Sequence, residues 1–143
     1  TMDHLPTILI VDDIAGFRKI FREFLSPLKN CNLLEAADGK EAWELLQHKK
    51  VDVVLTDISM PTMDGLTLLK KIRENPAFAD LYVIVTTAKS RKYAKDEVLR
   101  QGSDAFLSKP ILRQDLLNQV EMGFQKVVAR RNQRKCAGGI SAL

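Results

Sequence analysis

The 143-residue sequence predicts an α/β fold with a doubly wound, five-stranded parallel sheet. Five short runs of aliphatic and β-branched residues alternate with segments in which apolar residues recur every three or four positions. Within the runs, consecutive positions are apolar, which is typical of strands buried on both faces. Strands joined by single helices form right-handed βαβ units, so we expect helices on both faces of the sheet.

The first strand is predicted at Thr7–Val11, which reads TILIV and is followed by Asp12-Asp13. The next segment has the spacing of an amphipathic helix. This helix should end near Leu25, because Pro27 disfavours helical geometry in the residue before it. The apolar residues at this spacing are Phe17, Ile20, Phe21, Phe24, Leu25 and Leu28.

The middle of the chain repeats the strand–helix pattern twice. A weaker strand at Asn32–Ala36 precedes a helix with a capping box, in which Asp38 is the cap and Glu41 lies three residues later. The third strand, Val51–Asp57, is strongly β-branched and ends on a carboxylate. Asp64 can cap the helix that follows. The inward residues of these two helices are Ala42, Leu45 and Leu46, then Leu66, Leu69 and Ile72.

The last part of the chain completes the alternation. A fourth strand is predicted at Leu81–Val85, and a polar, basic helix follows over about Arg91–Gln101. Gly102 is placed to end this helix as its C-terminal cap. A short fifth strand at Ala105–Leu107 precedes a final helix that begins near Leu112. The inward residues of the final helix are Leu116, Leu117 and Val120.

Positive charge is concentrated near the C-terminal end. The formal net charge is +4, and residues 126–143 alone contain five basic residues and no acid. We therefore expect one globular domain at residues 5–128 and a basic, flexible tail or linker at residues 129–143. Nucleic-acid binding by the tail is disfavoured, because it has no aromatic residues for base stacking and no helix-turn-helix pattern follows.

The sequence also restricts the compartment. No apolar run approaches the length of a membrane-spanning helix, and no signal-peptide pattern precedes the first strand. The two cysteines, Cys31 and Cys136, follow no disulfide or metal-binding spacing. These features predict a cytoplasmic chain without a membrane partner.

Chemically distinctive residues follow four of the five predicted strands: Asp12-Asp13, Asp57, Thr87 and Lys109. In a parallel sheet these strand ends lie at one edge, where open α/β sheets bind ligands. Three carboxylates in one pocket repel each other, and Mg²⁺, or Mn²⁺ in its place, would remove that repulsion. The group predicts a site at which the Asp57 carboxylate is a nucleophile and becomes an acyl phosphate.

Four motifs in this order resemble a known family. They are DD after the first strand, D-x-x-M-P-x-M-D-G from Asp57, TTA after the fourth strand and F-L-x-K-P after the fifth. Together they resemble the receiver domain of two-component response regulators, especially the chemotaxis regulators. The resemblance covers about residues 5–128 and implies a flavodoxin-like (βα)5 fold with strand order 2-1-3-4-5.

The resemblance also implies how the site is used. Asp57 would accept a phosphoryl group from a histidine kinase or a phosphotransfer protein. Asp12, Asp13, Asp57 and the main-chain carbonyl of Ser59 would hold the Mg²⁺ ion. Such a domain is a phosphoacceptor rather than an enzyme, apart from self-phosphorylation by small acyl phosphates and self-dephosphorylation.

Further residues would transmit the signal. Thr87 and Lys109 would bind phosphoryl oxygens, with a cis peptide bond at Lys109-Pro110. Thr87 and the ring of Phe106 would form the switch that changes the face built from the fourth helix, fifth strand and fifth helix. That face would bind a downstream protein or a second copy of the chain. Its basic residues, which favour an acidic partner, include Lys92, Lys95 and Arg100.

Two alternatives remain open from the sequence. A small-molecule phosphatase could also use an aspartyl-phosphate intermediate, but such enzymes place a second acid two residues after the nucleophile, where this chain has Ser59. The chain could also be the receiver module of a larger nucleic-acid-binding regulator. The resemblance to receiver domains also implies that Ser59 and Lys89 flank the phosphoryl group and affect how long it persists.

Overall fold

The computed structural model describes residues 4–88 and 95–141. Its five strands form one parallel sheet in the order β2-β1-β3-β4-β5, which confirms the predicted order. Register is continuous across the sheet, with Leu9 opposite Val54 and Val54 opposite Val83. The strands are β1 Thr7–Val11, β2 Asn32–Ala36, β3 Val53–Asp57, β4 Tyr82–Thr87 and β5 Ala105–Ser108.

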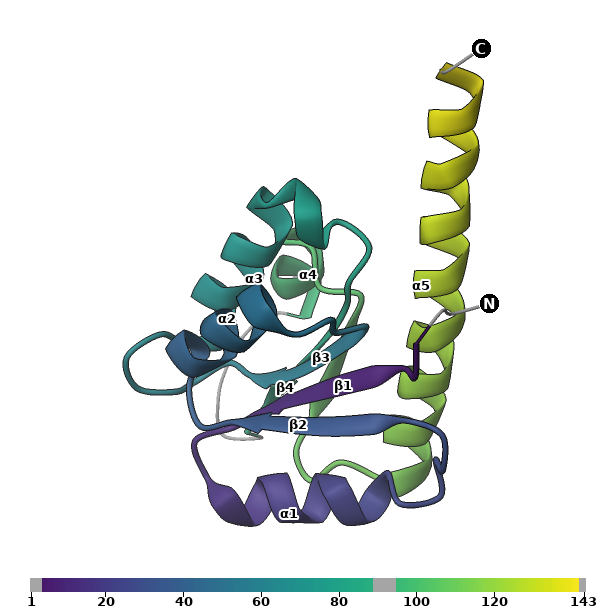
Figure 1. Ribbon diagram of the computed structural model, residues 1–143. Helices are drawn as coiled ribbons and strands as arrows, with labels where there is room; N and C mark the ends of the chain where they lie inside the picture. Colours follow the sequence, from purple (N-terminus) through teal and green to yellow (C-terminus); the bar gives the residue numbers. More distant parts are fainter. Residues whose placement is uncertain (1–3, 89–94, 142–143) are drawn as a thin grey trace.

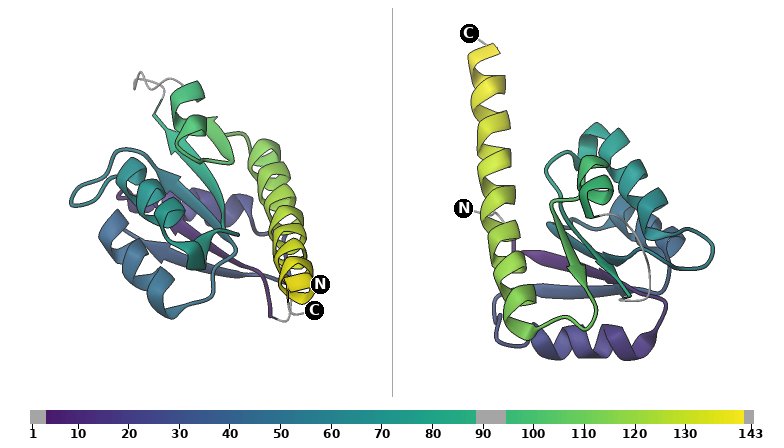
Figure 2. Two further views of the ribbon diagram at one scale, coloured as in Figure 1. Left: turned by 90° about the horizontal axis from the view of Figure 1, so that it is seen from above. Right: turned by 180° about the vertical axis from the view of Figure 1, so that it is seen from behind.

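Helices cover both faces of this sheet, so the fold is doubly wound as predicted (Figures 1 and 2). Helices α2, α3 and α4 lie on one face, and α1 and α5 lie on the other. The α-helices are α1 Ala15–Phe24, α2 Gly39–His48, α3 Gly65–Glu74, α4 Lys95–Arg100 and α5 Arg113–Ser141, and a short 3₁₀ helix, η1, spans Pro76–Phe78.

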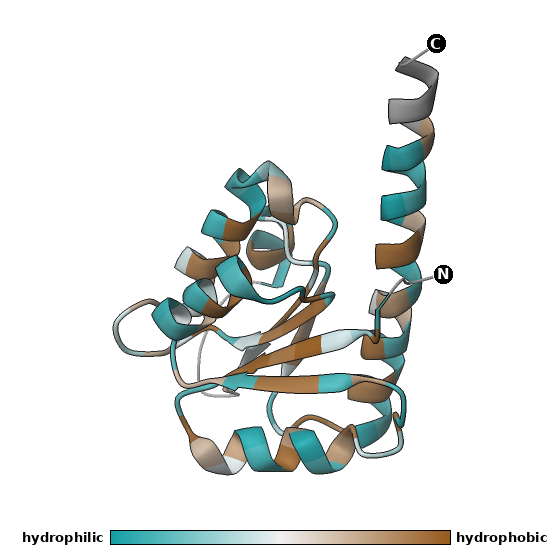
Figure 3. Ribbon diagram, viewed as in Figure 1, coloured by the Kyte–Doolittle hydropathy of each residue, from teal (hydrophilic) through white to brown (hydrophobic). Residues whose placement is uncertain are grey.

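The three inner strands, β1, β3 and β4, are buried throughout and largely apolar because each contributes to two cores (Figure 3). Leu9 and Val54 are buried on the α2–α3 side, whereas Ile8 and Leu55 are buried against α1 and α5. Successive side chains of a strand point to opposite faces, so a strand covered on both faces must be apolar at every position. This explains why runs such as TILIV show no alternation.

The structure contains the caps that the sequence predicts at the starts of α2 and α3 and at the end of α4. The Oδ1 atom of Asp38 accepts a hydrogen bond from the Glu41 amide at 2.8 Å, and Glu41 Oε2 accepts one from the Ala37 amide at 3.1 Å. Asp64 caps α3 in the same way through the Thr67 amide. Gly102 ends α4 with a φ of 108°, a conformation that favours glycine.

The C-terminal segment, expected to be a basic tail or linker from residue 129, is helical as far as it is described, and its flexibility stays a prediction. Helix α5 continues to Ser141, and its C-terminal part extends beyond the sheet (Figure 1). Composition suggested solvated arginines, but the fold places aspartates opposite them, at the amino-terminal ends of three strands. The resulting ion pairs, each 2.6 Å long, are Arg130–Asp104, Arg131–Asp52 and Arg134–Asp80.

Two further findings concern the helices. The fourth helix was expected from Arg91, but residues 91–94 lie outside the described residues, and α4 is seen from Lys95. Over the described ranges, every helix is too short or too polar to cross a lipid bilayer.

Candidate functional site

The residues predicted to meet at the carboxyl edge of the sheet do so. Asp12 and Asp13 follow β1, and Asp57 is the last residue of β3. One carboxylate oxygen from each of these three residues lies within 4.8 Å of the other two. Asp13 and Asp57 border a shallow cleft of about 490 Å³ whose lining also includes Ser59 and Lys109.

Asp12 is fixed in place at the bottom of this group. Its side chain is fully buried, and its Oδ1 atom accepts a hydrogen bond from the Ile14 amide at 2.9 Å. Its Oδ2 atom accepts one from Lys109 Nζ at 2.8 Å. Asp13, by contrast, is exposed at the rim of the cleft. The pair therefore offers one immobilised carboxylate and one accessible carboxylate.

Asp57 is buried but has few partners. Its side chain is 9% exposed, its Oδ1 atom accepts a hydrogen bond from the Ile58 amide at 3.0 Å, and its Oδ2 atom lies 3.7 Å from Lys109 Nζ. Burial raises the pKa of Asp57 above its usual value, and the charges of Asp12 and Asp13 add to the rise. The Lys109 ammonium and the Ile58 amide lower this pKa but do not cancel the effect of burial.

Lys109 links the site to β5 and α1. Its ammonium group lies 3.8 Å from the centre of the Phe17 ring, a cation–π arrangement. The expected cis peptide bond at Lys109-Pro110 is present. Phe17 itself was interpreted only as an inward residue of the first helix, because its spacing gives no sign that its ring would contact a site lysine.

Gly65 is a second residue whose role was missed, since it was interpreted simply as a loop residue. Its amide donates a hydrogen bond to the Ile58 carbonyl at 2.7 Å. A Cβ atom at this position would lie 2.0 Å from the main-chain oxygen of Asp57. No side chain fits there, so the start of α3 can press against the end of β3 only with glycine at position 65.

The switch candidates lie on neighbouring strands. Thr87 ends β4 and is 3% exposed, and its hydroxyl donates to the Ala88 carbonyl at 3.4 Å. Phe106 pairs with Val85 in the next strand, and its ring is partly buried on the α2–α3 side of the sheet. The structure thus brings Thr87 to the same edge as Asp57, and Lys89 lies outside the described residues.

The donor set suits a hard divalent cation. Among the described residues, the three carboxylates face one ammonium group, that of Lys109, so their negative charge exceeds the positive charge beside them. Carboxylate oxygens in this number, with room for water, are the ligands that Mg²⁺ or Mn²⁺ prefers. The Ser59 carbonyl as a further ligand stays a prediction.

The face expected to be basic has mixed charge where it is described. Lys95 and Arg100 of α4 are exposed, but Asp96 and Glu97 are exposed beside them. Lys92, the third basic residue of the prediction, lies outside the described ranges. The charge of α4 therefore gives no clear preference for an acidic partner.

The comparisons agree with this geometry. A family model described as "Response regulator receiver domain" matches residues 8–121. A chemotaxis protein CheY homolog of Campylobacter jejuni is 36% identical over 115 residues, which are 80% of this chain and 88% of that protein. The solved receiver domain of a Francisella response regulator superposes with a TM-score of 0.75 at 30% identity, covering 85% of this chain and 98% of that one.

A longer relative also matches. Response regulator Rre1 of Synechocystis is 35% identical over 136 residues, or 95% of this chain. The match covers 57% of that protein, so this chain spans little more than half the length of that relative.

Proposed function

Because this chain belongs to the receiver-domain family of two-component response regulators, we propose that it is a phosphorylation-dependent switch with Asp57 as the phosphoacceptor. Domains of this family are generally phosphoacceptor signalling modules rather than enzymes. The observation that carries the proposal is the position of Asp57 in the cleft, beside two acids and within 3.7 Å of the Lys109 ammonium.

The chemistry follows from these contacts. An Asp57 oxygen attacks the phosphorus of a phosphohistidine, the P–N bond breaks, and its electron pair returns to the imidazole nitrogen. Lys109 offsets the charge of the phosphoryl oxygens, and the Thr87 hydroxyl donates to one of them. Asp12, Asp13, Asp57 and the Ser59 carbonyl would hold a Mg²⁺ ion, which supplies further charge neutralisation when bound.

Phosphorylation would then change a binding surface. Movement of the Thr87 hydroxyl toward the phosphoryl group leaves room for the Phe106 ring to turn inward. The face of α4, β5 and α5 would respond by changing its affinity for a downstream protein or for a second copy of the chain. The proposal places these events in the cytoplasm, together with the donor kinase or phosphotransfer protein.

Two other functions are less well supported. A phosphatase would need a general acid, and Ser59 lines the cleft where that acid would stand. Nucleic-acid binding by the C-terminal segment is weakened by the ion pairs of Arg130, Arg131 and Arg134 with aspartates of the domain. A longer regulator would also have an effector activity. For this protein, such an activity stays a proposal.

Incubation with acetyl phosphate and Mg²⁺ tests the phosphoacceptor assignment. We expect one phosphoryl group per chain by intact mass, none on Asp57→Asn, and none when EDTA replaces Mg²⁺. Glu44→Gln, which removes an exposed acid of α2, is the matched control and should be labelled like the wild type. Full labelling of Asp57→Asn would contradict the assignment.

A further inference from the structure

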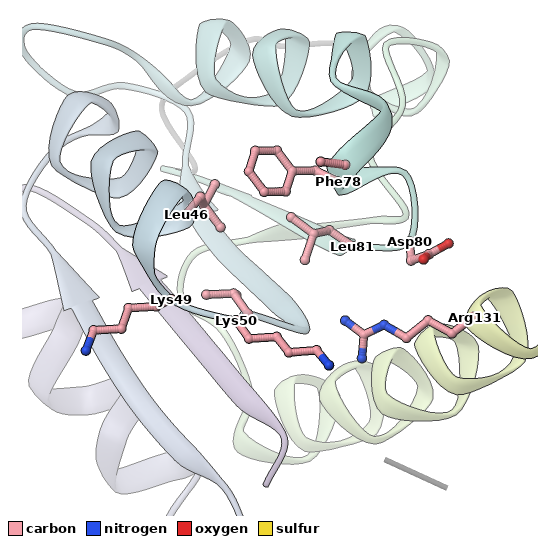
Figure 4. A pocket seen from close by; sticks show the side chains of 9 residues that line it. Leu46, Lys49, Lys50, Phe78, Asp80, Leu81 and Arg131 are labelled. Atoms are coloured by element: carbon pink, nitrogen blue, oxygen red, sulfur yellow. The ribbon is translucent and has the colours of Figure 1, made fainter. Parts of the chain in front are cut away.

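A second pocket lies at the opposite edge of the sheet from Asp57. It has a volume of about 190 Å³ and lies between the end of α2, the segment around η1, and α5 (Figure 4). Its apolar wall is formed by Leu46, Val51, Phe78 and Leu81. The edge of the Trp43 ring packs against the Phe78 ring at 5.5 Å, which supports this wall from behind.

The rim of the pocket carries two cations, Lys50 and Arg131. Figure 4 shows the side chains of Lys50 and Arg131 pointing toward one another across the opening. Lys50 has no ion-pair partner within the described ranges. The nearby Asp80 does not neutralise it, since that carboxylate is paired with Arg134 and points away from Lys50.

Arg131 keeps most of its hydrogen-bonding capacity. Its Nη1 atom donates to Asp52 Oδ1 at 2.6 Å, which orients the guanidinium. Asp52 is itself fully buried and also accepts from the Thr7 amide at 2.7 Å, so this contact is rigid. A guanidinium has five N–H donors, and among the described residues Arg131 uses one of them. The others remain for an anion.

From this combination we infer that the pocket binds a small carboxylate with an apolar body. The carboxylate lies between Lys50 and Arg131, and the apolar body lies against Phe78 and Leu46. The pocket is smaller than the roughly 300–1,000 Å³ that drug-sized ligands occupy, so the body is a single ring or a short branched chain. Charge-assisted hydrogen bonds fix the anionic end, and burial of the ring adds affinity.

Such a ligand would tie α5 to the domain. Arg131 belongs to α5, whose C-terminal part extends beyond the sheet, whereas Leu46 and Phe78 belong to α2 and η1. A ligand that contacts all three stabilises their arrangement, and the stabilisation grows with the logarithm of its concentration above Kd. The site is thus a means by which a small metabolite could affect α5 independently of Asp57.

Titration with benzoate, followed by amide chemical shifts, tests the inference. We expect saturable shifts in the residues around Phe78, Lys50 and Arg131, and no saturable shifts around Asp57. Lys50→Gln should weaken binding about tenfold, which is typical for the loss of a charge-assisted hydrogen bond. Lys40→Gln is the matched control, because Lys40 is an exposed lysine of α2, the helix that precedes Lys50, and does not line the pocket.

Two related probes test the class of ligand. Benzyl alcohol keeps the ring without the charge, and inorganic phosphate keeps the charge without the ring, so both should bind at least tenfold more weakly than benzoate. Equal binding by either probe would overturn the proposed ligand class. Non-saturating benzoate shifts, or equal weakening by Lys40→Gln and Lys50→Gln, would overturn the site itself. A labelling defect at Asp57 would leave these outcomes unaffected, so the two proposals fail separately.

Discussion

At the scale of single residues, the acids of this protein fall into two kinds. Asp104 accepts hydrogen bonds from Arg73, the Val83 amide and Arg130, so its charge is fully compensated. Asp57 is buried as well, but among the described residues its one short hydrogen bond comes from the Ile58 amide. Keeping a buried carboxylate ionised with few hydrogen-bond partners costs free energy of desolvation. A bound cation compensates the charge of Asp57, and phosphorylation changes the carboxylate itself, so either event lowers this cost.

Removal of the Asp57 charge should therefore stabilise the metal-free protein. The pKa of Asp57 is raised in the folded state, so ionised Asp57 destabilises the fold above that pKa, and the destabilisation is relieved as pH falls through it. In EDTA at neutral pH, we expect Asp57→Asn to raise the free energy of unfolding by on the order of 1 kcal/mol. Urea unfolding at several pH values measures this.

The pH dependence separates this cause from a general effect of the substitution. The difference between Asp57→Asn and wild type should shrink as pH falls below the folded-state pKa of Asp57, since the protonated carboxyl group resembles the amide. A difference that grew at low pH would show that burial does not raise the pKa of Asp57.

A divalent cation that binds the carboxylates of Asp12, Asp13 and Asp57 should stabilise the folded protein. A cation that binds the folded protein stabilises it by mass action, so Mg²⁺ in excess over its Kd should raise the melting temperature of the wild type by several degrees. Asp13→Asn should lose most of this increase, because it removes the exposed carboxylate of the cluster. Glu44→Gln should keep it. An equal increase in Asp13→Asn would place the cation elsewhere.

At the scale of elements, α5 is held by charge along its second half. The carboxylate of Asp104 joins α3, β4 and α5, because Arg73 of α3, the Val83 amide of β4 and Arg130 of α5 all donate to it. The Asp104 side chain is 15% exposed and that of Arg130 is 31% exposed, so solvent screens this network only in part. The network attaches the first part of the basic segment to the domain.

The two ends of this network should differ in energetic importance. Asp104→Ala leaves two arginines without their anion and should cost about 3 kcal/mol of unfolding free energy. Arg130→Ala leaves Asp104 still paired with Arg73 and should cost about 1 kcal/mol. Arg134→Ala, at the exposed pair with Asp80, is the control and should cost less than either. Chemical denaturation measures all three, and equal costs would contradict a shared role for Asp104.

At the scale of the whole molecule, the site and the proposed output face are joined through β4 and β5. Thr87 lies at the end of β4, and Phe106 lies in β5 opposite Val85. A local change at Asp57 can therefore reach the α4–β5–α5 face across two hydrogen-bonded strands. This path has two discrete states if the Phe106 ring has two positions.

Thr87→Ala should separate phosphorylation from its consequence. Without the hydroxyl, we expect labelling of Asp57 by acetyl phosphate to continue at a reduced rate, because Mg²⁺ and Lys109 remain. The amide shifts of Phe106 and Leu107 that accompany labelling in the wild type should be largely lost. Unchanged shifts in the labelled variant would mean that Thr87 takes no part in transmitting the signal.

Much of the fold and the site could be predicted from the sequence because the information is local. Apolar runs mark the strands, Asp38 and Asp64 mark helix starts, and the rule that parallel strands end at one edge brings Asp12 and Asp57 together. These features depend on a residue and its near neighbours in the chain, so they can be recognised without knowledge of the tertiary structure.

The sequence by itself thus determined the α/β class, the strand order through its family motifs, and the acids that meet with Lys109. Only the tertiary structure decided that Phe17 lies under Lys109, that Gly65 must lack a side chain beside Asp57, and that the basic segment of α5 pairs with distant aspartates. These features depend on contacts between residues far apart in the chain. Composition and periodicity report what each segment prefers, whereas the partner that a charge or a ring meets is set by how the segments pack.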